Sequence, residues 1–119
     1  MIEYYDLLKK MEAKPAMWTG ELSLKSIRTF LSGYSYALEE YNLDEEQIVD
    51  QPNFHDWVAE KLGFFESTPG WANMILAVTI GLNPKKIDWT NYDLSVTKEQ
   101  HKKSIQKFYL LLEEFVTTK

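Results

Sequence analysis

The chain has no cysteine, which excludes disulfide bonds, thiolate metal sites and cysteine nucleophiles. Long apolar runs are also missing: the longest, from Met74 to Leu82, has nine residues and is interrupted by Thr79 and Gly81. A helix needs about 20 apolar residues to cross a bilayer. The N-terminus is charged from its third residue and has no apolar signal-peptide core. We therefore expect a cytoplasmic protein that is not bound to a membrane, although many periplasmic proteins also lack cysteine.

Basic residues are outnumbered: 13 Lys and Arg face 18 Asp and Glu, for a formal net charge of −5. Nucleic-acid binding requires clustered Lys and Arg to neutralise phosphates, so no nucleic-acid partner is expected. If the partner is charged, we expect it to be basic rather than acidic. A length of 119 residues with 45% hydrophobic residues suits one folded domain spanning residues 1–119.

Apolar spacing predicts an all-α fold, a compact bundle of about five helices in a single domain. The clearest helix follows Ser23, a suitable N-cap, and repeats apolar residues every three or four positions. Gly33, in its middle, predicts close approach of another backbone. Thr97 and Gln100 form a capping box before the last helix. The expected helices span about 2–13, 24–41, 54–63, 69–82 and 98–116, with irregular segments at 16–20, 42–51 and 83–96.

Catalytic motifs are absent from the sequence. His55 and His101 are the only histidines, and neither has a partner at metal-ligand spacing. His55 and Asp56 are neighbours on a helix and point about 100 degrees apart, so they do not form a catalytic dyad. No nucleophile motif or phosphate-binding loop is present. We expect no catalytic residues, cofactor or metal. An enzyme with a site of scattered carboxylates and His101 is the least favoured hypothesis; a deep pocket holding His101 beside a carboxylate would support it.

Acidic residues concentrate in the middle of the chain. Between Thr29 and Glu60 there are eight acids and no Lys or Arg. Solvated loops and helix ends explain this distribution without any partner. The functional alternative is an acidic face that binds a basic protein and accelerates the encounter. The centre of that face would be Glu39, Glu40, Asp44, Glu45, Glu46 and Asp50.

Tryptophan is the second candidate feature. Trp57 and Trp71 lie on apolar stripes and are expected in the core, whereas Trp18 and Trp89 fall in predicted connectors. A connector tryptophan either covers the core or anchors an interface. We favour the covering role for both, and keep Trp89 as a candidate partner-binding residue. An apolar groove near Trp18 and Trp89 would suit a peptide or helix, and the aromatic content also allows a homodimer.

Four segments carry a family resemblance. They are Pro15-Ala16-Met17-Trp18-Thr19-Gly20 followed by Ser23-Leu24, Phe30-Leu31-Ser32-Gly33-Tyr34, Phe54-His55-Asp56-Trp57-Val58, and Gly70-Trp71-Ala72-Asn73-Met74-Ile75. Their order, closed by an aromatic-rich helix, resembles small, largely uncharacterised bacterial proteins, some of the toxin-immunity type. The resemblance implies an immunity-like protein that neutralises a toxin, such as a basic toxin domain, by occlusion. Our first hypothesis combines this role with the acidic face. The alternative is a regulatory or scaffold module that binds a peptide or helix in the apolar groove.

Overall fold

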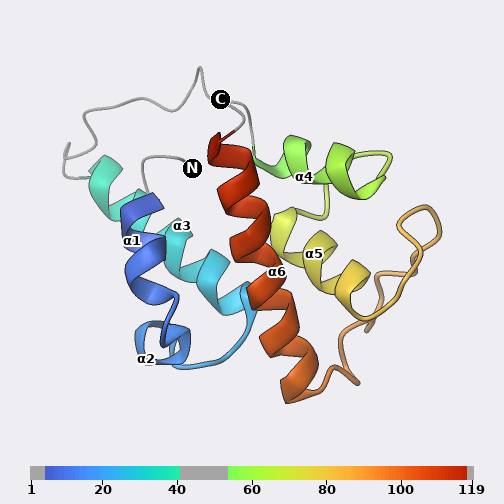
Figure 1. Cartoon of the computed structure of the whole chain (residues 1–119), viewed down its shortest axis with the longest axis horizontal. Helices are drawn as coiled ribbons and strands as arrows, with labels where there is room; N and C mark the ends of the chain where they lie inside the picture. The colour runs from blue at the N-terminus through green and yellow to red at the C-terminus, as the bar shows by residue number, and fades with distance from the viewer. Residues whose placement is uncertain (1–4, 41–53, 118–119) are drawn as a thin grey trace.

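Helices joined by turns and irregular segments make up the part of the chain that the structure describes. The computed structural model describes residues 5–40 and 54–117, apart from the side chains of Leu38 and Glu39. Within these residues there are six helices and no strand, so the predicted all-α fold is confirmed (Figure 1). The helices are α1 (Tyr5–Met11), α2 (Pro15–Thr19), α3 (Leu24–Glu40), α4 (Phe54–Leu62), α5 (Trp71–Thr79) and α6 (Lys98–Thr117).

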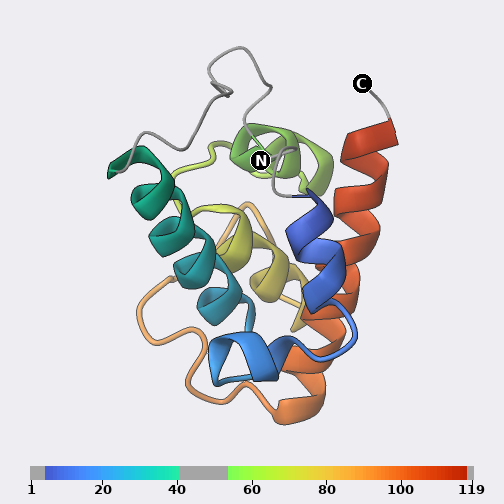
Figure 2. The same cartoon turned by 90° about the vertical axis from the view of Figure 1, so that its left-hand side faces the viewer.

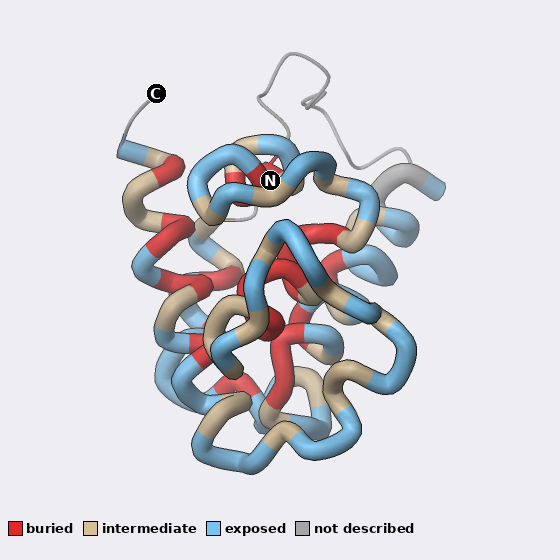
Figure 3. Tube along the Cα trace, turned by 90° about the vertical axis from the view of Figure 1, so that its right-hand side faces the viewer, coloured by how far each residue is buried: buried red, intermediate tan, exposed pale blue. Residues whose placement is uncertain are grey.

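Helix α5 forms the centre of the bundle because it is apolar on nearly every side. It contacts α3, α4 and α6, and α6 crosses beside it along the length of the molecule (Figure 1). The view in Figure 2 shows α1 and α2 on the outer side of α3 and α6. In Figure 3 the buried positions lie on the inner sides of the helices, and exposed positions cover the outside. The buried residues of α5 are Trp71, Ala72, Met74, Ile75, Leu76 and Ala77.

The core is rich in stacked and edge-on aromatic rings. Trp71 of α5 stacks on Phe108 of α6 with centroids 4.6 Å apart. Phe54 of α4 meets Phe115 edge-on at 5.1 Å. Such aromatic pairs add to the energy of area burial, so they fix α4 and α5 against α6. Trp71 lies in the core as predicted, and Trp57 is half-buried and packs against it.

The predicted helix caps are present. The Ser23 hydroxyl accepts the N–H of Ser26 at 3.1 Å and so caps α3. At the start of α6, the N–H of Gln100 donates to the Thr97 hydroxyl at 3.1 Å, and the N–H of Thr97 donates to the Gln100 side chain at 2.9 Å. This reciprocal pair is the capping box expected from the sequence.

Two local predictions are wrong, and a third is not supported by the described residues. Residues 16–20 are not irregular, because Pro15 is preset for the first turn of α2 and Gly20, at φ +84°, ends it. Helix α5 begins at Trp71 rather than at Pro69, because Gly70 (φ +86°, ψ 155°) breaks the helical path between them. Among the described residues, no atom outside the backbone of α3 lies within 4 Å of the position that a Cβ of Gly33 would occupy, so the predicted close approach of another backbone is not found there.

Candidate functional site

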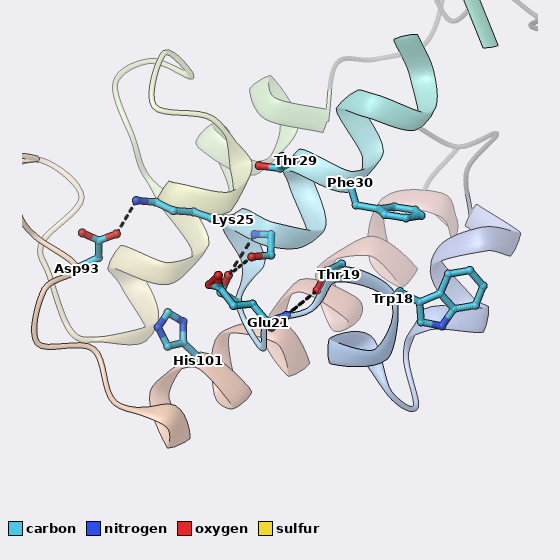
Figure 4. A pocket seen from close by; sticks show the side chains of 10 residues that line it. Trp18, Thr19, Glu21, Lys25, Thr29, Phe30, Asp93 and His101 are labelled. Carbon is cyan, nitrogen blue, oxygen red and sulfur yellow. Dashed lines mark hydrogen bonds and ion pairs between the residues drawn. The ribbon is translucent and has the colours of Figure 1, made fainter. Parts of the chain in front are cut away.

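Two adjoining hollows, which share Lys25 and Asp93, lie between α3 and the segment that leads into α6. The first, here called the Trp18 hollow, has a volume of about 580 Å³ (Figure 4). The second, the Trp89 hollow, has a volume of about 470 Å³. We call the two together the groove. Besides Lys25 and Asp93, the groove is lined by Trp18, Thr19, Glu21, Ser23, Ser26, Thr29, Phe30, His101, Glu66, Thr68, Pro69, Asn73, Trp89, Asn91 and Tyr92.

An ion pair marks the junction of the two hollows. Nζ of Lys25 on α3 lies 2.5 Å from Oδ2 of Asp93, which precedes α6 (Figure 4). The hydrogen bond from Lys25 lowers the pKa of the Asp93 carboxyl. The same ammonium lies 5.7 Å from the centre of the Tyr92 ring. Lys25 therefore ties α3 to the 90–96 segment at the middle of the groove.

The Trp18 hollow has an apolar end and a polar end. Figure 4 shows Trp18 and Phe30 on one side of the hollow, and Asp93 and His101 on the other. Trp18 comes from α2 and meets Phe30 of α3 edge-on, with centroids 6.3 Å apart. Because 43% of Trp18 is exposed, it lies on the rim of the groove and does not cover the core, contrary to the sequence prediction. Its indole presents an aromatic surface to solvent.

The Trp89 hollow is framed by hydrogen-bonded side chains. Trp89 is half-buried: it stacks on Phe64 with centroids 6.2 Å apart and meets Tyr92 edge-on at 5.0 Å. The Tyr92 hydroxyl donates to Oδ1 of Asn73 at 2.6 Å, and Nδ2 of Asn73 donates to the Pro69 carbonyl at 2.8 Å. Burial raises the pKa of the Tyr92 hydroxyl, and the charge of Asp93 raises it further. Trp89 packs against the core, which confirms its predicted covering role.

His101 lies at the polar end of the Trp18 hollow, in the same hollow as Asp93 and Glu21. Its Nδ1 is buried and has no hydrogen-bond partner among the described residues. Asp93 instead binds Lys25. In His-Asp triads a carboxylate bonded to Nδ1 orients the histidine that acts as the base, and Nδ1 of His101 has no such bond among the described residues. Residues 5–40 and 54–117 also contain no cluster of three or more His, Asp or Glu that could hold a metal ion.

The second histidine lies away from the groove. Nδ1 of His55 on α4 accepts the backbone N–H of Trp71 at 2.8 Å. The neighbouring Asp56 accepts a hydrogen bond from the Ser67 hydroxyl at 2.5 Å. His55 and Asp56 therefore bind different partners, in agreement with the expectation that they form no dyad.

Of the six residues of the predicted acidic face, only Glu40 has a side chain within the described part of the structure. Glu40 is exposed at the end of α3. Glu39 belongs to the same helix, but its side chain is outside the described part of the structure. The remaining candidates, Asp44, Glu45, Glu46 and Asp50, also lie outside the described residues.

Sequence reasoning identified Trp18, Trp89 and His101 but missed the residues that join the groove. Lys25 and Asp93 are 68 positions apart, and no local pattern connects them. Glu21 and Glu66 likewise come from separate connectors. These residues give the groove its charge: among the described residues that line it, Glu21, Glu66 and Asp93 carry carboxylates, and Lys25 carries the one ammonium.

Comparisons with known proteins identify no relative: no family model, curated protein or solved structure matches this chain. Among the described residues, no helix has the length and apolar character needed to cross a membrane. The toxin-immunity resemblance therefore stays a hypothesis.

Proposed function

We propose that this protein is a cytoplasmic binding protein that holds a basic segment of a partner protein in the groove. The observation that carries this proposal is the combination of an exposed tryptophan with an excess of carboxylates in one groove. Trp18 offers a rigid aromatic surface at one end, and aromatic anchors dominate the energy of many interfaces. Glu21, Glu66 and Asp93 outnumber the single Lys25.

The occupant follows from this chemistry. Lysine or arginine side chains complement the carboxylates, and their cationic ends are also attracted to the faces of Trp and Tyr rings. Apolar or aromatic side chains of the same segment would pack beside Trp18 and Phe30, which lie edge-on to each other. The net charge of −5 favours approach of a basic protein over an acidic one.

Selection of 12-residue peptides from a random display library on the immobilised full chain tests this proposal. We expect the selected peptides to combine Lys or Arg with aromatic or large aliphatic residues. Their affinity should fall about tenfold or more with Trp18→Ala, since loss of an interface anchor costs about 1–2 kcal/mol or more. Glu21→Lys should weaken binding mainly at low salt. Both positions are exposed, so thermal unfolding can verify that the variants fold.

Leu110→Ala is the matched control, because Leu110 is 73% exposed on α6 and lines neither hollow. It should leave peptide affinity unchanged. A library that yields no peptide above background contradicts a peptide-binding groove. So does a set of peptides whose affinity is the same for Trp18→Ala as for the wild type. Predominantly acidic peptides would contradict the proposed charge of the occupant.

A second candidate function, toxin neutralisation through the acidic face, is supported by charge. Residues 39–50 contain six acids and no basic residue, and Glu40 is exposed. Such a surface would match the basic cleft of a toxin domain and increase the association rate. We expect the triple variant Glu40→Lys, Glu45→Lys, Glu46→Lys to slow association with the toxin encoded by a neighbouring gene, and to weaken its salt dependence.

The two candidates can be separated kinetically. Loss of Trp18 should increase the dissociation rate, as is usual for a packed anchor, while loss of the acids should reduce the association rate. If the toxin associates with the triple variant at the wild-type rate at low salt, the acidic-face proposal is wrong.

A further inference from the structure

The central helix α5 lacks an N-cap in its own sequence. It begins at Trp71 directly after Gly70, which has no side chain with which to cap it. The first N–H groups of a helix have no partner within the helix, and leaving them unpaired is costly where the helix is buried, as it is at Trp71 and Ala72. The structure supplies an acceptor from another helix: Nδ1 of His55 on α4 accepts the N–H of Trp71 at 2.8 Å.

This hydrogen bond requires one protonation state of the imidazole. A nitrogen that accepts an N–H carries no proton, so the neutral ring must bear its proton on Nε2. A proton on Nδ1 would convert the acceptor into a donor that faces another donor. The cap therefore exists only while His55 is neutral.

The charged surroundings of His55 oppose its protonation. Arg28 of α3 lies over Gly70, with guanidinium atoms 3.2–3.4 Å from the position that a Cβ there would occupy. The N-terminus of α5 adds a partial positive charge. Burial lowers the pKa of His55, and Arg28 lowers it further, whereas the neighbouring Asp56 raises it. Part of the Asp56 carboxylate is engaged by the Ser67 hydroxyl.

We propose that His55 is a pH-dependent N-cap that holds the start of α5 in place at neutral pH and releases it in acid. Two residues at this end of α5 make contacts with other parts of the fold. Trp71 stacks on Phe108 in the core. Asn73, two residues further, accepts the Tyr92 hydroxyl and donates to the Pro69 carbonyl in the wall of the Trp89 hollow. Protonation at one partly buried contact thus acts on both the core and the groove, independently of what the groove binds.

The chain contains only two histidines, so this proposal can be tested residue by residue. The measurement is amide hydrogen exchange of Trp71, expressed as a protection factor, between pH 7.5 and 4.5. Opening takes up one proton, so the protection factor should fall by up to about tenfold per pH unit between the pKa of the open state and the lower pKa of the folded state, and level off below the latter. In His55→Asn, the amide oxygen occupies a position near that of Nδ1 and does not titrate, so this pH dependence should disappear. His101→Asn should retain it.

Two outcomes would overturn the proposal. The first is a His55→Asn variant whose Trp71 protection falls with acid as steeply as in the wild type. The second comes from the wild-type chain alone and needs no variant to fold. Imidazole nitrogen chemical shifts at neutral pH report the tautomer, and a proton on Nδ1 of His55 is incompatible with the cap. A proton on Nε2, with a Trp71 amide resonance that shifts as His55 titrates, would support it.

Discussion

The Tyr109 hydroxyl donates a hydrogen bond of 2.7 Å to the backbone carbonyl of Leu8, 101 residues earlier in the chain. That carbonyl lies where α1 ends, and the N–H of Glu12, its usual helical partner, bonds instead to the carbonyl of Lys9. Leu8 and Tyr109 are both buried. Burial raises the pKa of Tyr109 to about 12, so the hydroxyl stays a donor at physiological pH. A side chain of α6 thereby provides a hydrogen-bond donor for a backbone carbonyl at the end of α1.

Removing this hydroxyl should destabilise the fold. In Tyr109→Phe the Leu8 carbonyl remains buried without a partner, which costs about 1–3 kcal/mol. Urea unfolding followed by circular dichroism measures the loss. Tyr36→Phe is the control, because Tyr36 is 66% exposed, and surface substitutions usually stay within about 0.5 kcal/mol. Equal unfolding midpoints for the two variants would show that the α1–α6 hydrogen bond contributes nothing.

Gly33 and Gly81 form a matched pair for backbone effects. Within the described part of the chain, neither glycine has a non-local atom within 4 Å of its Cβ position, but Gly81 has φ +93°, whereas Gly33 lies within α3. Gly33→Ala should raise the free energy of unfolding by about 0.5–1 kcal/mol, because alanine loses less entropy in a helix. Gly81→Ala should lower it by about 1 kcal/mol or more, since φ > 0 disfavours a Cβ. A Gly33→Ala variant that unfolds at lower denaturant concentration than the wild type would contradict this prediction.

The sequence correctly predicted the helices that are marked by a cap or an apolar repeat within their own residues. Helix α6 followed from its capping box, and α3 from its apolar repeat and from Ser23. The sequence failed where a short helix depends on its two end residues, as in α2 between Pro15 and Gly20. It also misplaced the start of α5, because Pro69 suggested a first turn while Gly70 adopts a conformation outside the helix. The N-terminus of α5 is capped by His55 of another helix, so the residues next to α5 contain no capping signal that could have been recognised.

The sequence pointed to three residues of the candidate site, Trp18, Trp89 and His101, but not to the charged residues between them. Trp18 and Trp89 could be singled out because each lies in a segment predicted to be irregular, where a tryptophan covers the core or anchors an interface. The charged pair between them could not be found, since Lys25 and Asp93 meet only after α3 and the segment before α6 have packed together. A tertiary contact of this kind leaves no periodicity or spacing in a single sequence.

The two hydrogen bonds of the α6 capping box should each contribute to the free energy of unfolding, and their contributions should be coupled. Thr97→Ala removes the acceptor of the Gln100 N–H and should cost about 1 kcal/mol. Gln100→Ala removes the partner of the Thr97 N–H and should cost less, since that amide is exposed and can bond to water. Thermal unfolding of the single variants and the double variant measures their coupling, with exposed Ser95→Ala as the control. Strictly additive effects would argue against a cooperative box.

The Lys25–Asp93 ion pair predicts a small, salt-sensitive stabilisation that is lost in acid. The hydrogen bond from Lys25 holds the pKa of Asp93 below its ordinary value of 3.8, so the folded state favours the carboxylate. The resulting stability is fully present above about pH 5 and disappears as the pH falls through the folded pKa.

Asp93→Asn tests this, and should lower the free energy of unfolding by at most about 1 kcal/mol at pH 7, because the pair is partly exposed. The deficit should shrink in 1 M salt and vanish near pH 2. In the control, Asp88→Asn, the amide oxygen can still accept the Thr90 N–H, so its stability should differ little from wild type. A deficit that persists at pH 2 and in high salt would mean that Asp93 stabilises the groove by packing and not by charge.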